Sequence, residues 1–164
     1  MTTAELRRLY KPKKIKTLFI GESPPDPSQG NLNYFYNASS SFGNFGCLIR
    51  AVGIDPKIGK ADALRAFMEA GCFLIDVTET PVDKLVDAKQ RPVLVRQGFV
   101  VQLDEIKLLL PDRPTVIVLG RMAEAACRSM LEQMGHTVHY AHLPSQGWQN
   151  KSLTMIREAL LHQS

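Results

Sequence analysis

The sequence has few cysteines, no long apolar run and no low-complexity tract. Its three cysteines, Cys47, Cys72 and Cys127, are odd in number and far apart, which argues against a disulfide framework or a paired-cysteine metal site. We expect them to be reduced thiols of the core. No apolar stretch approaches the roughly 20 residues that cross a bilayer, and residues 1–16 lack the apolar segment of a secretory signal. We therefore expect no membrane association and a cytoplasmic or nucleoid location.

The composition is that of a folded protein rather than a disordered tail. Of 164 residues, 45% are hydrophobic and 22% are charged. We expect a single domain over residues 1–164, long enough to bury a sizeable core. The formal charge of +4 permits nucleic-acid binding without requiring it. Much of the positive excess lies in residues 1–16, which we interpret as a solvated basic leader, with phosphate contact as the alternative.

The order of apolar patterns indicates the fold class. Four apolar runs predict buried strands at residues 17–21, 72–77, 115–120 and 137–142. Helical spacing of apolar residues follows at 60–70, 100–110, 122–134 and 152–161. Because strands alternate with helices, we predict an α/β fold, a three-layer α/β/α sandwich with a central four-stranded parallel sheet. Two segments, 23–46 and 79–97, are predicted to be long loops, and such loops in a compact domain usually carry function.

The first predicted strand ends in an unusual segment, Gly-Glu-Ser-Pro-Pro at residues 21–25. A buried parallel strand delivers the residues that follow it to the carboxyl edge of the sheet, where open α/β proteins bind their ligands. The two prolines forbid an immediate helix, so we expect Glu22 on a rigid loop. Tyr34, Phe35 and Tyr36 follow shortly after. A carboxylate beside aromatic rings suits acid–base chemistry on a flat ring; for an isolated Gly-Glu pair, a turn cap is the alternative.

The other predicted strands deliver further polar residues to the same edge. Asp76 ends the second strand and His142 ends the fourth. After the third strand, Gly120 leads into a helix whose free N–H groups suit an anion, although a plain strand-to-helix turn is the alternative. This segment lacks the glycines of a dinucleotide site and the lysine of a P-loop, which argues against a nucleotide cofactor.

Two more segments contain residues with alternative roles. Ser145 either contacts a ligand or, like Asn150, caps the last helix. Trp148 is either a core anchor or an exposed ring that touches a partner. The second long loop contains four basic residues, which on composition alone suit an ordinary solvated surface loop: Lys84, Lys89, Arg91 and Arg96.

Three segments together resemble the uracil-DNA glycosylase superfamily. Residues 18–24, Leu-Phe-Ile-Gly-Glu-Ser-Pro, are similar to its first motif, especially the Gly-Glu-Ala-Pro-Gly form of its iron–sulfur branch. Residues 117–123 are similar to the third-strand Leu-Gly-Arg-Thr-Ala segment of that branch. Residues 143–145, Leu-Pro-Ser, are similar to its late His-Pro-Ser motif. Their order and spacing cover nearly the whole chain, and the fold of that family is the sandwich predicted above.

The resemblance implies a monofunctional DNA glycosylase of base excision repair, a monomer that acts on single- or double-stranded DNA without a metal or cofactor. Glu22 would orient the water that attacks the anomeric carbon of a flipped nucleotide, with His142 as a second catalytic residue. The aromatic residues Tyr34, Phe35 and Tyr36 would form the base pocket, with Phe35 or Tyr36 stacking on the base. Asp76 stands where the family often has an Asn that reads the base edge.

The resemblance also implies a DNA-binding surface. Ser145 would hold a phosphate, and the loop from Gln146 to Trp148 would press into the minor groove. The second long loop would lie near the DNA backbone and supply phosphate contacts, which position the protein without reading sequence. The basic residues that would make these contacts are Lys84, Lys89, Arg91 and Arg96, and Arg121 would also bind DNA. Extruding a base costs a few kcal/mol, which stacking and phosphate contacts must offset.

The chain departs from the family pattern in three respects. An iron–sulfur cluster needs four cysteine ligands, and this chain has three scattered cysteines. An ionised Asp76 offers no donor to a uracil carbonyl, so a base with an exposed amino group would fit it better. If Leu143 aligns with the family histidine, the residue that stabilises the departing base is missing, whereas a shift of one residue lets His142 take this role.

These departures leave two alternatives to a DNA glycosylase. One is a non-catalytic module on the same fold that binds a nucleobase or nucleic acid. The other is a hydrolase of free nucleosides, which the modest net charge suggests.

Overall fold

The computed structural model describes residues 1–26, 33–82 and 87–162. Its centre is a parallel sheet of four strands in the order β2-β1-β3-β4. The strands are β1 (Thr17–Gly21), β2 (Cys72–Asp76), β3 (Thr115–Leu119) and β4 (Val138–Ala141). All four strands predicted from the apolar runs are confirmed, with ends that agree to within one residue.

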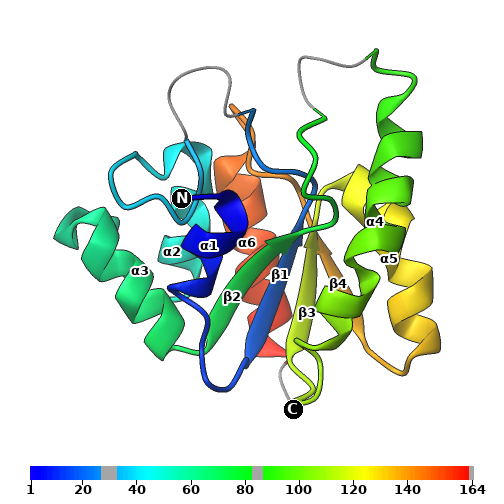
Figure 1. Ribbon diagram of the computed structural model, residues 1–164. Helices are drawn as coiled ribbons and strands as arrows, with labels where there is room; N and C mark the ends of the chain where they lie inside the picture. Colours follow the sequence, from blue (N-terminus) through cyan, green and yellow to red (C-terminus); the bar gives the residue numbers. More distant parts are fainter. Residues whose placement is uncertain (27–32, 83–86, 163–164) are drawn as a thin grey trace.

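Helices cover both faces of this sheet (Figure 1). One face carries α4 (Arg91–Lys107) and α5 (Arg121–Gln133). The other carries α2 (Gly46–Ala51), α3 (Lys60–Glu69) and α6 (Gln149–Leu161). Three short helices complete the described elements: α1 (Thr3–Arg8), η2 (Gly43–Phe45) and η3 (Pro56–Ile58). The predicted three-layer α/β/α sandwich is therefore confirmed.

The strands are buried because both faces of the sheet are covered. Every residue of β1 and β2 is buried, as is all of β3 except Thr115. This explains why they read as continuous apolar runs instead of alternating patterns. Cys47, Cys72 and Cys127 are free and buried, as expected for core thiols.

Helix boundaries differ most from the sequence expectations in α4. This helix begins at Arg91, whereas the pattern predicted a loop through residue 97 and a helix from residue 100. Pro92 occupies the first turn, where its missing N–H costs no helical hydrogen bond. Part of the second predicted loop is therefore helix, and Lys84 of that loop lies outside the described residues.

The basic leader also contains unpredicted structure. Residues 3–8 form α1, whose start is fixed by a capping box in which Thr2 and Glu5 exchange side-chain and backbone hydrogen bonds. Arg7 of this helix is buried, which corrects the interpretation of the whole leader as solvated. Within the first predicted loop, η2 forms from residue 43, and α2 begins at its end.

The strand register brings the carboxyl ends together at one edge, uppermost in Figure 1. Gly21 pairs with Asp76 across β1 and β2, and Leu119 pairs with Ala141 across β3 and β4. The segments that follow the four strands therefore leave the sheet at the same level. In the described part of the chain, no helix is both long and apolar enough to cross a membrane.

Candidate functional site

A small pocket lies at the carboxyl ends of β1 and β2. Its walls include Ser23, Pro24 and Pro25 from the segment after β1, together with Tyr34, Phe35 and Asp76. We call it the Asp76 pocket. The structure thus brings together three residues that the sequence predicted for a base pocket, and it joins them to the loop that carries Glu22. With a volume of about 50 Å³, the pocket has room for roughly four water molecules.

Asp76 is a buried carboxyl group that faces this pocket. The residue is only 9% exposed, and this exposure is toward the pocket that it lines. Burial raises its pKa to about 7, and the negative charges of Glu79 and Glu22 act in the same direction, while Arg7 opposes them. Close to pH 7 this carboxyl is therefore neutral in a substantial part of the molecules.

Arg7 is buried next to the pocket and forms ion pairs with two partly exposed carboxylates. Its guanidinium, 1% exposed, donates to Glu79 Oε1 at 2.5 Å and to Glu105 Oε1 at 2.8 Å. Gln102 Nε2 donates to the same Glu79 oxygen at 2.8 Å. Burial alone would lower the pKa of Arg7, but Glu79 and Glu105 raise it above its usual range. Glu79 and Glu105 therefore offset much of the positive charge of Arg7, which weakens the effect of Arg7 on the pKa of Asp76.

The sequence reasoning did not identify Arg7 or Glu105 as part of the site. Arg7 is 72 residues from Glu79 and 98 residues from Glu105 in the sequence, so no local pattern pairs them. The signal that was available is the Thr2–Glu5 capping box, which marks a helix start inside the basic leader.

Glu22 lies at the start of the loop after β1 and is half-buried. Its carbonyl oxygen accepts a hydrogen bond from the Thr78 N–H at 3.3 Å, which extends the pairing of β1 with β2 beyond Asp76. Its negative charge contributes to the raised pKa of Asp76. Glu22 and Asp76 therefore form a pair of neighbouring carboxyl groups that differ in burial.

The three aromatic residues of the predicted base pocket have different surroundings. Tyr36 is fully buried, and its hydroxyl donates to the Leu74 carbonyl at 3.0 Å and accepts from the Leu74 N–H at 2.6 Å. No face of its ring is open to a ligand in this arrangement. Its ring instead packs edge-to-face against Phe35, with centroids 5.0 Å apart, and so supports the ring that lines the pocket. Tyr34 lines the pocket itself, and burial raises the pKa of its hydroxyl.

Lys60, from the start of α3, fixes the loop that carries these rings. Its Nζ donates to the carbonyl oxygens of Tyr34 and Ser41, at 2.9 and 3.1 Å, and to Ser40 Oγ at 3.0 Å. Burial lowers the pKa of Lys60 to about 8. This lysine therefore positions the pocket wall from behind and does not face the pocket.

A second group of side chains lies at the other half of the same edge. His142 contacts Trp148, with ring centroids 4.9 Å apart, and Tyr140, whose hydroxyl is 3.4 Å from His142 Nδ1. Arg121 lies over the Tyr140 ring and Lys151 over the Trp148 ring, at 6.0 and 5.5 Å from the ring centroids. We call these five residues the Trp148 cluster. The Trp148 side chain is 47% exposed, so it is not a core anchor.

His142 does not belong to the Asp76 pocket. It follows β4, whereas Asp76 ends β2, and these are the two edge strands of the sheet. Three strand spacings separate their backbones, roughly 14 Å in total, and Glu22 is about 10 Å from His142 on the same basis. Of the two residues predicted to be catalytic, the structure places only Glu22 beside the pocket.

The remaining predicted DNA contacts lie on the surface of the same edge. Ser145 and Gln146 are exposed in the loop before α6. The Ser145 N–H donates to the Leu143 carbonyl at 2.7 Å, and no side chain caps the start of α6, so neither Ser145 nor Asn150 serves as its cap. Lys89 is exposed before α4, and Arg91 is its first residue.

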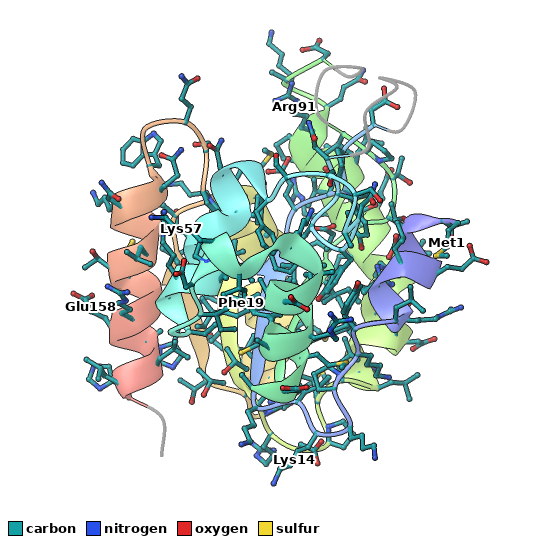
Figure 2. All side chains as sticks on the ribbon, turned by 90° about the vertical axis from the view of Figure 1, so that its left-hand side faces the viewer. Met1, Lys14, Phe19, Lys57, Arg91 and Glu158 are labelled. Atoms are coloured by element: carbon teal, nitrogen blue, oxygen red, sulfur yellow. The ribbon has the colours of Figure 1, made fainter. Side chains whose placement is uncertain are left out.

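The lysines of the basic leader lie elsewhere. Lys14 and Arg91 are at opposite ends of the molecule (Figure 2). Because Arg91 is at the end that holds the Asp76 pocket, a ligand bound there is remote from Lys14. Phosphate contact by this end of the leader would therefore be separated from the candidate site, whereas Arg7, also in residues 1–16, lies beside it.

No set of three or more histidine, cysteine, aspartate or glutamate side chains in residues 1–26, 33–82 and 87–162 is arranged to hold a metal ion. The site's chemical groups are instead two carboxyls, buried rings and an exposed aromatic surface with cations. The chain matches no family model and no curated protein sequence.

Proposed function

We propose that this protein hydrolyses the N-glycosidic bond of a damaged or deaminated base in DNA. The observation that supports this best is the Asp76 pocket. Tyr34, Phe35 and Asp76 surround one small pocket, and the loop that begins with Glu22 forms its rim. Base release needs an aromatic ring that stacks on the base and a polar group that binds the edge of the base. It also needs a carboxylate beside the sugar, and Phe35, Asp76 and Glu22 are the proposed groups.

In the proposed reaction the flipped base enters the pocket and its sugar stays at the rim. Glu22 accepts a hydrogen bond from a water molecule and takes its proton as the water oxygen bonds to C1′ of the sugar. The bond between C1′ and the base nitrogen breaks, and its electron pair leaves with the base, which then takes up a proton. The negative charge of Glu22 also stabilises the positive character that develops on the sugar.

The pocket must widen to take a base, because its present volume suits only a few water molecules. Phe42 and Phe45, on the outer side of the pocket, are only partly buried. Outward movement of these two rings makes room without disturbing the sheet. Loop rearrangements on ligand binding occur in many enzymes and in a substantial minority of complexes.

The Trp148 cluster is the proposed contact with the DNA strand. An exposed indole offers a stacking surface for any base, and Arg121 and Lys151 beside it supply positive charge for phosphates. It lies at the same edge of the sheet as the Asp76 pocket. A strand bound across this edge can reach both, and its affinity should fall steeply with salt.

One observation favours a non-catalytic binding module instead. His142 packs against Tyr140 and Trp148, and it lies on the far side of the sheet edge from Asp76. In this arrangement it does not stabilise a departing base in the pocket. A module of this kind would bind bases or oligonucleotides and release none.

The test compares Glu22→Gln with Glu158→Gln, a control on the exposed surface of α6. Base release from lesion-containing oligonucleotides is followed by chromatography, and oligonucleotide affinity by fluorescence anisotropy. We expect Glu22→Gln to abolish release while affinity stays within about twofold, and Glu158→Gln to behave as wild type. Release that survives Glu22→Gln contradicts the role of Glu22. Tight binding by wild-type protein without any release supports the binding module, and release from free nucleosides that is independent of salt supports a nucleoside hydrolase.

A further inference from the structure

The outer side of α4 exposes apolar side chains to water. Val100 and Val101, in the middle of the helix, are 73% and 82% exposed, and Leu108 at its end is 73% exposed. Val93, in the first turn, is also exposed. These residues recur at intervals of seven and eight, so they form a stripe along one side of the helix. Monomeric proteins rarely leave a large apolar patch open to water, and such patches commonly mark interaction surfaces.

The apolar stripe continues onto the neighbouring helix. α4 and α5 lie side by side on one face of the sheet (Figure 1). A groove of about 360 Å³ runs between them, lined by Val100 and Leu103 of α4 and by Met130 of α5. Met130 is itself exposed. We call this surface the α4–α5 face, and its apolar residues are Val93, Val100, Val101, Leu103, Leu108 and Met130.

Two opposite charges are placed symmetrically about the centre of this face. Arg96 lies four residues before Val100 and Asp104 lies four residues after it, and both side chains are exposed. Arg96 Nε donates to the Pro92 carbonyl at 3.3 Å. Within the part of the chain that the structure describes, neither Arg96 nor Asp104 forms an ion pair. Both charges are therefore available to an opposite charge on a partner.

This spacing makes the face complementary to itself. Let a second copy of the chain lie with its α4 antiparallel to the first and with Val100 facing Val100. Arg96 of each copy then comes to the level of Asp104 of the other, and Val93 comes close to the level of Leu108. A two-fold axis makes each of these pairs occur twice. The charges thus favour a second copy of this chain as the partner.

We propose that the protein forms a two-fold symmetric dimer through the α4–α5 face, in place of the monomer that the family resemblance implies. α4 has 17 residues and is about 25 Å long, and two helices side by side are about 20 Å wide. The face therefore buries roughly 500 Å² of each copy, about 1,000 Å² in total, which is the low end for specific interfaces. We expect a dissociation constant in the micromolar range. The two Arg–Asp pairs fix the antiparallel orientation more than they add affinity.

The dimer leaves the candidate site open. α4 begins at the carboxyl edge of the sheet, the end of the molecule that holds the Asp76 pocket (Figure 1). Because the two copies of α4 run in opposite directions, their pockets lie at opposite ends of the dimer. No apolar residue of the α4–α5 face lines the pocket or belongs to the Trp148 cluster. The inference is thus independent of the proposed hydrolysis.

Sedimentation velocity of the full chain, from about 1 to 300 µM, tests the dimer. Val100→Glu places a charge at the centre of the face, and Leu161→Glu, at a similarly exposed apolar position of α6 on the other face of the sheet, is the matched control. Arg96→Asp, Asp104→Arg and the double variant that carries both changes test the pairing. Circular dichroism checks that each variant is folded, and all the changes lie at exposed positions.

We expect wild type and Leu161→Glu to dimerise with dissociation constants within twofold of each other, and Val100→Glu to weaken the dimer at least tenfold. Each single charge reversal sets like charges against each other twice, so it should weaken the dimer at least fivefold. The double variant restores opposite charges and should return to within threefold of wild type. Wild type that stays monomeric at 300 µM, or a Val100→Glu variant that dimerises like wild type, would overturn the dimer. A double variant no better than the single reversals would overturn its antiparallel arrangement.

Discussion

The Asp76 carboxyl packs directly against Gly21 of the neighbouring strand. Its Oδ1 lies 2.5 Å from the point where a side-chain Cβ at residue 21 would stand. The two residues are also paired in the register of β1 and β2. A glycine at this position is therefore what lets a buried carboxyl reach the carboxyl edge between two strands.

Gly21→Ala tests this close approach. The new methyl group cannot coexist with Asp76 in its present position, so the carboxyl must move, at a cost of about 1–3 kcal/mol in the free energy of unfolding. We also expect at least a tenfold loss of uracil affinity. Gly46→Ala is the control, since its Cβ would meet only Phe42 at an ordinary 3.7 Å. Urea unfolding and NMR titration measure both effects, and unchanged binding by Gly21→Ala would contradict the proposed place of Asp76.

Replacement of Asp76 itself should stabilise the protein at high pH. The pKa of Asp76 is about 7 in the folded state and near 3.8 in the unfolded state. Between these values the folded state binds more protons, so the contribution of Asp76 to stability falls as pH rises and is lowest above pH 7. Asp76→Asn should therefore gain on the order of 1–3 kcal/mol at pH 8 and nothing at pH 3.5.

Unfolding free energies at several pH values, with Asp112→Asn as control, check this prediction. A stability gain for Asp76→Asn that is equal at pH 4 and pH 8 would show that Asp76 is ionised in the folded protein.

Arg7→Met should destabilise the protein. The change leaves Glu79 and Glu105 without the cation they share, and because both carboxylates are about a third exposed to water, the cost should be about 1–3 kcal/mol. Since Arg7 opposes the upward shift of the Asp76 pKa, that pKa should also rise further. Arg8→Met, on the exposed side of the same helix, should change stability by less than about 0.5 kcal/mol. Urea unfolding measures both variants. If Arg7→Met lowered the free energy of unfolding as little as Arg8→Met, the ion pairs of Arg7 would have no structural role.

The sequence predicted the sheet well because its strands are buried on both sides and bounded by turns. Val116 to Leu119 form a short apolar run, which predicts a buried strand. Gly120 ends this run with a φ of +92°, a conformation that residues with a side chain rarely adopt. The start of α4 was missed because Pro92 and Gly98 lower its apparent helical character. Both are tolerated there, one in the first turn and the other where Thr78 packs closely.

The site was predicted less completely, since contacts between distant segments decide it. The edge position of Asp76 followed from the topology alone. The interior location of Tyr36 depends on hydrogen bonds to Leu74, and the burial of Arg7 depends on Glu79 and Glu105. The sequence correctly predicted His142 at the carboxyl edge of the sheet. Its distance from Asp76 depends on the strand order, which no local sequence pattern contains.

Trp148→Ala separates DNA binding from base binding. Loss of one stacked base typically costs about 1–3 kcal/mol, so oligonucleotide affinity should fall by roughly tenfold or more. Uracil affinity should stay unchanged because Trp148 lies outside the Asp76 pocket. Trp148→Phe retains an aromatic ring and should keep most of the oligonucleotide affinity. Equal losses for uracil and oligonucleotide would mean that the Trp148 cluster and the pocket are one site.

Release of free base by the wild-type protein is the most direct test of the proposed chemistry. Single- and double-stranded oligonucleotides, each with one deoxyuridine, deoxyinosine or deoxyxanthosine, are incubated with excess protein at pH 6.5, and the released base is measured by chromatography. We predict release from at least one of them, slowing above pH 7 as Asp76 loses its proton. No release from any of these substrates, in either strand form, would contradict the assignment of the Glu22–Asp76 site to base excision.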